Sequence, residues 1–444
     1  MNKEFHKKQN FFSFSDIDSE RKDRIMKFTS TEATPAPHVP PGVLRLTGAA
    51  KEDIPMYRIQ TMNKISPVGL NRFPSELYEV GDAVQDPQGI LVRSAKLLDL
   101  EFNPSLLAIA RAGVGVNNIP LDRCAAAGIP VFSTPGANAN AVKELVICAM
   151  LMGSRDIPGA IRWVREQAAS GVDVSTVVEK GKSAFIGPEL YKKTLGIIGL
   201  GAIGSIVANT AISLGMDVYG YDPFLSVDTA LRLDRHVHVV KDINDLYKRS
   251  DYITMHIHYT EKTAHMIDAD AIAAMKRGVR VINLARGEIV DDEAMLTALD
   301  TGMVAAYITD FPNNRLLTAP HVIAMPHLGA STPESEQNCA AMAVDTLRDY
   351  LESGNIRSSV NLPEMTMDRS GVQRLCVLHK NVPGMLANIT SLFGRDGVNV
   401  ENLSNKSRGD YAYTMVDVNT RINDQVADEL RAIEGVIRVR VLNH

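Results

Sequence analysis

The chain has 444 residues, of which 45% are hydrophobic and 22% are charged, and its formal net charge is −5. That length exceeds one ordinary hydrophobic core, so we expect two or three domains. The acidic balance argues against nucleic acid or an anionic membrane as a partner, and no apolar run reaches transmembrane length. The four cysteines have no metal-ligand spacing, which predicts reduced thiols in a cytoplasmic protein and no metal site.

The first 53 residues differ in composition from the rest of the chain. A Pro-rich stretch at 35–41 predicts an extended linker, and the acidic residues between 16 and 23 argue against a mitochondrial transit peptide. We therefore expect residues 1–53 to be an N-terminal extension that is disordered. Because Met56 opens the first clearly patterned segment, translation from Met56 is an open alternative.

From residue 54 to about 155, short apolar runs alternate with helical patterns. The runs at 90–93, 107–111 and 129–132 predict strands, and residues 140–152 predict a long helix. Alternation of this kind is typical of a parallel sheet whose strands are joined by helices.

The same alternation resumes near residue 193 and ends in a strand at 322–325. Thr332 and Pro333 then supply a capping hydroxyl and a proline at the first helical position. We expect this helix to run to about Glu352, with Gly354 behind it. Residues 355–370 are polar and contain two turn signals, which predicts a second linker.

A glycine-rich turn in mid-chain is the most informative feature. A strand-like run leads directly into Gly-x-Gly-x-x-Gly at Gly199, Gly201 and Gly204, and a helical pattern follows at once. A second strand then ends at Asp222, 18 residues after Gly204. This is the dinucleotide-binding fingerprint in its strand–turn–helix–strand context.

The same turn indicates which dinucleotide binds. The first helical residues, Ala202 and Ile203, present backbone N–H groups to a pyrophosphate at the positive end of the helix dipole. Asp222 is placed to accept hydrogen bonds from the adenine-ribose hydroxyls and to repel a 2′-phosphate. The sequence therefore predicts NAD in preference to NADP.

Two candidate catalytic residues follow strands of the same predicted sheet. Arg286 comes after the strand at 279–283, and His327 comes after the strand at 322–325. Ligands of doubly wound sheets lie at the carboxyl ends of the strands, which is where both residues fall. Oxidation of a 2-hydroxy acid needs a base for the hydroxyl proton and a cation for the carboxylate, and histidine and arginine suit these roles.

The last 74 residues form a separate pattern in the order strand, helix, strand, strand, helix, strand. This unit is too small to be a second catalytic domain and has no internal Gly-rich loop. A regulatory role is the prediction.

These motifs together resemble the D-isomer-specific 2-hydroxyacid dehydrogenases, and within them the members that oxidise 3-phospho-D-glycerate, over roughly residues 56–444. The resemblance implies an α/β fold with two doubly wound parallel-sheet domains, a Rossmann NAD domain inserted in a flavodoxin-like substrate domain. It places the substrate domain at 54–155 and 329–362 and the NAD domain at 156–328. Residues 371–444 would be a βαββαβ ACT domain.

The resemblance also implies roles for individual residues. Arg286, in the N-x-A-R-G motif, and His327, in the P-H-x-G motif, match the family's catalytic positions. The family's substrate loop corresponds to a loop that contains Val114 and Gly115. The cationic positions that lie near a substrate phosphate in the family correspond to Arg93, Ser94 and Arg111. A polar position of the substrate loop corresponds to Asn138. His256 follows a strand whose end borders NAD in relatives, although local packing is an open alternative for this residue.

One position departs from the family pattern. The carboxylate that usually orients the catalytic histidine aligns with Asn314, and an amide accepts a hydrogen bond but cannot stabilise an imidazolium as a carboxylate does. We interpret Asn314 as the group that orients His327. Asp310, four residues earlier, is an alternative source of the charge, and it is also open that neither residue has this role.

In the C-terminal unit, His379, Asn381 and Asn399 match positions that hold serine in the serine-inhibited relatives. The resemblance thus implies that the protein oxidises 3-phosphoglycerate in the first step of L-serine biosynthesis. It also implies that the C-terminal unit binds L-serine as an effector; the alternative is that this unit is a dimerisation module without a ligand. It also implies a homotetramer formed through the NAD and ACT domains. Another D-2-hydroxyacid dehydrogenase, such as a hydroxypyruvate or glyoxylate reductase, is the alternative function, and an NAD-sensing binding protein without turnover is a third.

Overall fold

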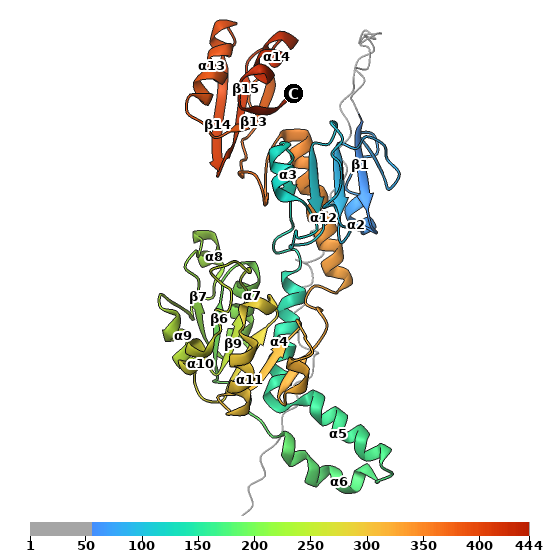
Figure 1. Cartoon of the computed structure of the whole chain (residues 1–444), viewed down its shortest axis with the longest axis vertical. Coiled ribbons are helices and arrows are strands. Elements are labelled where there is room, and N and C mark those ends of the chain that lie inside the picture. Colours follow the sequence, from blue (N-terminus) through green and yellow to red (C-terminus); the bar gives the residue numbers. More distant parts are fainter. Residues whose placement is uncertain (1–55, 444) are drawn as a thin grey trace, which may run out of the picture. The chain divides into compact units, whose positions relative to one another are not determined.

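The computed structural model describes residues 56–443, which form two parallel sheets and one antiparallel sheet with their helices (Figure 1). The predicted N-terminal extension at 1–53 lies outside the described residues. The expected α/β fold, with two doubly wound parallel sheets and a C-terminal βαββαβ unit, is confirmed.

The first sheet has five parallel strands in the order β2-β1-β3-β4-β5, which is the flavodoxin-like order. Its strands are β1 (Tyr57–Met62), β2 (Tyr78–Gly81), β3 (Gly89–Val92), β4 (Ala108–Arg111) and β5 (Val131–Phe132). All four residues of β3 are buried, as expected for a central strand with both faces covered. Helices α2 (Pro67–Leu70), α3 (Leu121–Ala126) and α12 (Pro333–Ser353) accompany this sheet.

The second sheet has seven parallel strands in the order β12-β11-β10-β9-β6-β7-β8, which contains the Rossmann order with one added strand. Its strands are β6 (Thr194–Ile198), β7 (Asp217–Tyr221), β8 (Val237–Val240), β9 (Tyr252–Met255), β10 (Val279–Asn283), β11 (Val304–Thr309) and β12 (Val322–Ala324). The helical segments between them are α7 (Ala202–Ser213), α8 (Val227–Arg232), α9 (Ile243–Arg249), α10 (Ala269–Ala273), η3 (Gly287–Ile289), α11 (Asp292–Asp300) and η4 (Leu316–Thr318).

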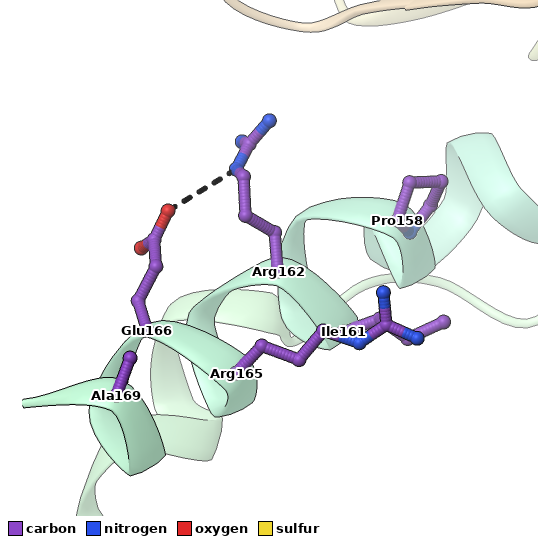
Figure 2. A pocket seen from close by; sticks show the side chains of 6 residues that line it. All are labelled: Pro158, Ile161, Arg162, Arg165, Glu166 and Ala169. Atoms are coloured by element: carbon purple, nitrogen blue, oxygen red, sulfur yellow. Dashed lines mark ion pairs between the residues drawn. The ribbon is translucent and has the colours of Figure 1, made fainter. Parts of the chain in front are cut away.

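Between the two sheets in sequence lie α4 (Ala139–Arg155), α5 (Ile157–Ala169), α6 (Val174–Gly181) and η2 (Lys182–Phe185). The strand and helix alternation did not predict α5 and α6. Trp163 of α5 packs on Phe185 with 6.1 Å between ring centroids. The outer face of α5 carries the exposed Ile161 among charged side chains (Figure 2).

Helix α12 has the predicted caps. Thr332 accepts a hydrogen bond from the Ser335 N–H, Pro333 is the first helical residue, and Gly354 ends the helix with a φ of 75°. The segment that follows is not a free linker as predicted. Ile356 and Met365 exchange backbone hydrogen bonds and are buried in the core of the first sheet, because apolar residues are interspersed among the polar ones.

The C-terminal unit has the predicted βαββαβ order: β13 (Gln373–Lys380), α13 (Met385–Arg395), β14 (Val400–Arg408), β15 (Tyr411–Val418), α14 (Asp424–Ala432) and β16 (Val436–Asn443). Its antiparallel sheet has the order β14-β15-β13-β16. One face packs on α13 and α14 through residues such as Ile389 and Leu430. Side chains of the other face, including Leu378 and Met415, belong to the same hydrophobic core as α12.

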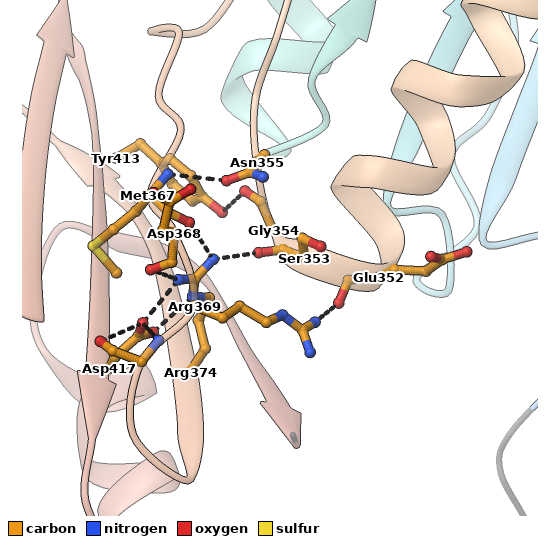
Figure 3. Close-up of polar contacts among 11 residues, drawn as sticks. Glu352, Ser353, Gly354, Asn355, Met367, Asp368, Arg369, Arg374, Tyr413 and Asp417 are labelled. Carbon is orange, nitrogen blue, oxygen red and sulfur yellow. Dashed lines mark hydrogen bonds and ion pairs between the residues drawn. The ribbon is translucent and has the colours of Figure 1, made fainter.

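Polar side chains of this unit also bind the C-terminal carbonyls of α12 (Figure 3). Arg374 donates to the Ser353 oxygen at 2.9 Å, and the Tyr413 hydroxyl donates to the Gly354 oxygen at 2.6 Å. Arg440 donates to the oxygens of Tyr350 and Leu351. The last carbonyls of a helix have no partner within it and carry its negative dipole end, so cationic donors stabilise α12 here.

Candidate active site

The predicted nucleotide turn has the geometry that its glycines require. Gly199 follows β6 with a φ of 90°, and a Cβ at this position would lie 2.6 Å from the His256 carbonyl oxygen. A Cβ on Gly204 would lie 1.9 Å from the Gly199 oxygen, so helix α7 approaches the turn too closely for a side chain. Gly201 meets nothing within 4 Å, which leaves its surface open at the start of α7.

Asp222 is held at the end of β7 by two backbone groups. One carboxylate oxygen accepts from the Leu200 N–H at 2.9 Å, and the other accepts from the Phe224 N–H at 2.8 Å. These bonds fix the carboxylate beside the glycine turn, which is the position needed to bind ribose hydroxyls.

His256 follows β9 and lies against the same turn. Its backbone N–H donates to the Ile198 oxygen at 2.8 Å, and its Nε2 lies 3.2 Å from the Thr254 hydroxyl. Burial lowers the pKa of His256 to about 4, so the ring is neutral at physiological pH. A neutral ring beside the turn is compatible with both the cofactor-binding and the packing interpretations of this residue.

Two arginine guanidinium groups border the loop after β4, and the charge of a third arginine acts on one of them. Arg111 donates from Nε to the Arg93 oxygen at 2.9 Å. A Cβ on Gly115 would lie 3.4 Å from Nη2 of Arg286 and 3.6 Å from Nη1 of Arg111, so both guanidinium groups border this glycine. Burial lowers the pKa of Arg111, and the neighbouring charges of Arg286 and Arg93 lower it further. Such a cluster of like charges favours binding of an anion.

The predicted substrate loop follows Arg111 directly. Gly113 has a φ of 159°, and a Cβ there would lie 2.9 Å from Nη1 of Arg111, so the loop wraps closely around that side chain. Val114 and Gly115 come next and are partly buried. The backbone N–H of Ser94, on the neighbouring loop, donates to the Asn63 side chain at 3.1 Å.

The N-x-A-R-G motif has a structural basis. The Asn283 amide donates to the Arg286 carbonyl at 2.8 Å, and its oxygen accepts from the Ala285 N–H at 3.1 Å. Asn283 is fully buried and therefore fixes the loop that presents Arg286. Sequence reasoning used Asn283 only as the end of a strand, although its place in the motif was the available signal.

Asp310 is the acidic group near His327. Asp310 is 1% exposed, one oxygen accepts from the Gly329 N–H at 3.3 Å, and the other has no hydrogen-bond partner. Burial raises the pKa of Asp310, and the charge of His327 opposes that rise. The Phe311 ring lies 4.7 Å from the His327 ring, measured between centroids.

Asn314 lies on the exposed loop after Phe311. Within residues 56–443 the structure records no hydrogen bond between Asn314 and His327, whereas the electrostatic field of His327 acts on Asp310. The burial of Asp310 and this charge effect are the grounds on which we propose Asp310, rather than Asn314, as the group that stabilises a charged His327.

Asn138 lies at the start of α4, in a loop next to the nucleotide turn. Its side-chain oxygen is buried without a hydrogen-bond partner, as is the hydroxyl of Thr134. A Cβ on Gly136, between them, would lie 3.2 Å from the Ala202 side chain. Buried polar atoms are normally satisfied, so these two atoms indicate a place for a polar ligand. Sequence reasoning missed Thr134, and nothing in its local pattern distinguishes it.

The three predicted effector residues are not brought together within one chain. His379 is buried, with Nδ1 2.8 Å from the Lys380 oxygen and Nε2 2.8 Å from the Thr414 hydroxyl. The Asn381 amide donates to the Gly409 oxygen at 3.1 Å. Asn399 comes directly before β14. The first residue of β14 pairs with the last residue of β15, which in turn pairs with Gln373 at the far end of β13. Six residues of strand separate Gln373 from His379, which is about 20 Å.

The comparisons with known proteins agree with this geometry. Residues 147–329 match the D-isomer specific 2-hydroxyacid dehydrogenase NAD binding domain, and residues 375–438 match an AHAS small subunit-like ACT domain. D-3-phosphoglycerate dehydrogenase of Haemophilus influenzae is 32% identical over 379 residues, which cover 82% of this chain and 88% of that protein. The chain belongs to the D-isomer specific 2-hydroxyacid dehydrogenase family.

Other relatives extend beyond the match. D-3-phosphoglycerate dehydrogenase of Synechocystis is 36% identical over 326 residues, which cover 71% of this chain but only 56% of that protein. Several curated relatives are thus matched over little more than half their length. The solved NAD+-bound 3-phosphoglycerate dehydrogenase of Entamoeba histolytica is 26% identical, with a TM-score of 0.53, over 69% of this chain and 99% of that one.

The matched domain is an NAD binding domain, and NAD is its cofactor. The predicted family and cofactor are confirmed. The open surface at Gly201 and the fixed carboxylate of Asp222 fit this cofactor. In the part of the chain that the structure describes, no helix is long and apolar enough to cross a membrane.

Proposed function

We propose that this chain oxidises 3-phospho-D-glycerate to 3-phosphohydroxypyruvate with NAD, in the first step of L-serine biosynthesis. The observation that carries this proposal is that the guanidinium groups of Arg111 and Arg286 border the substrate loop and that the charge of Arg93 acts on Arg111. A substrate with both a carboxylate and a phosphate needs more than one cation, and a simple 2-hydroxy acid does not.

In this proposal, His327 removes the proton from the C2 hydroxyl as general base. Arg286 holds the carboxylate and the developing carbonyl oxygen, together with the backbone N–H groups of Val114 and Gly115. Asp310 stabilises the charge that His327 gains. NAD, when bound, accepts the hydride from C2.

The phosphate would be bound by Arg111 and Arg93, with Ser94 and Asn138 supplying further polar contacts. We propose the domain division 54–155 and 329–362 for the substrate, 156–328 for NAD and 371–444 for regulation. The prediction that the protein is cytoplasmic stays a prediction.

A substrate panel tests this function. Steady-state rates are measured for 3-phospho-D-glycerate, D-glycerate and D-lactate with NAD, and for the first substrate with NADP. We expect kcat/KM to be highest for 3-phospho-D-glycerate with NAD. A higher value for D-glycerate or D-lactate would assign the chain to another D-2-hydroxyacid dehydrogenase. That alternative has support from a glyoxylate/hydroxypyruvate reductase of Sinorhizobium meliloti, whose structure is 26% identical with a TM-score of 0.56 over 68% of this chain and 97% of that chain.

We further propose that L-serine binds at the ACT unit between two copies of the chain. The separation of Asn399 from His379 and Asn381 supports this, because only a second copy can bring all three types of group to one ligand. Calorimetric titration with L-serine checks the proposal, and Asn381→Ala should weaken binding. If L-serine neither binds nor alters the rate, the ACT unit has a purely structural role.

A homotetramer formed through the NAD and ACT domains is the assembly that we propose. The exposed apolar side chains of α5, among them Ile161 and Val164, support a contact near the NAD domain. Light scattering after size exclusion measures the mass of the assembly. Ile161→Asp should reduce it, whereas a monomeric wild-type chain would rule the assembly out.

A further inference from the structure

The ion pair between Arg93 and Glu336 lies in the proposed phosphate site. Nη2 of Arg93 is 2.6 Å from Oε1 of Glu336, and the side chains are 41% and 45% exposed. Glu336 belongs to the first turn of α12, directly after the segment that carries His327. The cation proposed to bind a substrate phosphate is therefore already paired with a carboxylate of the same chain.

The charge of a second cation, Lys64, also acts on Glu336. The hydrogen bond from Arg93 lowers the pKa of Glu336, and the charge of Lys64 acts in the same direction. Lys64 lies beside Asn63, whose side chain holds the backbone of Ser94 and Ala95. A carboxylate released from Arg93 thus has an alternative cationic neighbour at the edge of the site.

The strength of this pair determines which ligands replace it. A half-exposed ion pair contributes little net stability, since both groups are well solvated when apart. A phosphate has up to two negative charges and three acceptor oxygens, and it binds a guanidinium better than one carboxylate does. D-Glycerate and D-lactate have one carboxylate, which Arg286 and the substrate loop take, and so they have no group to displace Glu336.

We propose that Glu336 is a specificity-determining residue that occupies Arg93 until a phosphate group displaces it. The inference rests on the proposed function for the identity of the substrate, but not for the competition itself. Glu336 lowers affinity for every ligand that needs Arg93 and leaves ligands that do not need it unaffected.

Glu336→Gln tests the proposal because it removes the charge and keeps the size of the side chain. The matched control is Glu334→Gln, which lies in the same helical turn, is exposed and has no ion pair recorded in the described chain. Both changes remove one negative charge near the helix N-terminus, so effects of the helix dipole cancel in the comparison.

Two measurements are made on the full-length protein. Calorimetric titration with inorganic phosphate should show about two- to fivefold tighter binding to Glu336→Gln than to wild type, the range expected for an exposed ion pair. The KM for 3-phospho-D-glycerate should fall by a similar factor, while the KM for D-glycerate should not change. Glu334→Gln should behave as wild type in both, and Glu336→Asp should fall between wild type and Glu336→Gln.

The outcomes separate this inference from the proposed function. Unchanged or weaker phosphate binding by Glu336→Gln would overturn it, since Glu336 would then merely position Arg93. Phosphate binding does not depend on turnover, so a wild-type enzyme inactive on 3-phospho-D-glycerate would overturn the function alone. In an Arg93→Ala background, Glu336→Gln should no longer affect phosphate affinity, and a persisting effect would also contradict the proposal.

Discussion

At the scale of the residue, His327 has two candidate partners that differ in burial. Asp310 is buried and keeps one oxygen unpaired, whereas Asn314 is exposed. A buried carboxylate interacts more strongly with a nearby charge than an exposed amide does, because water screens it less. The aligned motif alone pointed to Asn314, and only the packing of the loop distinguishes the two residues.

Asp310→Asn should lower kcat for the oxidation. The proposed transfer of the hydroxyl proton gives His327 a positive charge, which a nearby buried carboxylate stabilises and an amide does not. Steady-state rates measure the effect. Asn314→Ala is the control and should keep the wild-type kcat. A loss of kcat in Asn314→Ala without one in Asp310→Asn would reverse the assignment.

Gly199 and Gly201 should respond differently to substitution by alanine. Gly199→Ala places a side chain at a φ of 90° and against the His256 backbone, so we expect a loss of stability of about 1–2 kcal/mol from the backbone conformation alone. Gly201→Ala meets open space and should fold normally, yet it should weaken NAD because the Cβ lies where the pyrophosphate approaches. Thermal unfolding and a fluorescence titration with NAD measure the two effects. Equal stability losses in both variants would contradict this division of roles.

At the scale of the element, the unexpected feature is how the ACT unit meets α12. Arg374 and Asp417 are both fully buried, and Arg374 also donates to the carbonyls of Ser353, Met367 and Asp368 (Figure 3). The sequence shows a lone arginine in an apolar strand, with no indication of what it contacts. Its partners lie between 6 and 43 residues away in the sequence, which local patterns do not reveal.

Arg374→Ala should cost about 3–5 kcal/mol, because it leaves Asp417 buried without a counter-charge and three carbonyls without a donor. The double change Arg374→Met with Asp417→Leu should cost less, since it removes both charges. Arg431→Ala, which breaks an exposed pair with Asp428 on α14, is the control and should have little effect. Urea unfolding followed by circular dichroism measures each variant. A loss for Arg374→Ala no larger than that for Arg431→Ala would show that this buried network does not hold the unit in place.

At the scale of the whole molecule, the sequence allowed most strands of both parallel sheets and the full order of the ACT unit to be predicted, whereas β1, β2 and β8 were not predicted. Periodic apolar runs, the glycine turn and the caps of α12 are local signals, and they predicted local structure correctly. Two features required tertiary contacts. Helices α5 and α6 interrupt the alternation, and the segment after Gly354 is buried through Ile356 and Met365 although most of its residues are polar.

Part of the candidate site could be predicted because local sequence motifs mark it, and the rest depends on tertiary contacts. Arg286, His327 and the nucleotide turn lie in motifs that chemistry constrains, whereas Glu336 and Thr134 become candidates only through what they face in the fold. The ACT residues show the limit most clearly, because their proposed site needs a second copy of the chain.

The central claim is that the arginine cluster binds the phosphate of the substrate. The most direct test is the ratio of kcat/KM for 3-phospho-D-glycerate to that for D-glycerate, measured with NAD for wild type and for Arg111→Ala. Loss of a charge-assisted contact of about 1.5–3 kcal/mol should lower this ratio roughly 10- to 100-fold. A large wild-type ratio that falls in Arg111→Ala is the predicted result. A ratio near one in wild type, or a ratio that Arg111→Ala leaves unchanged, would contradict the account.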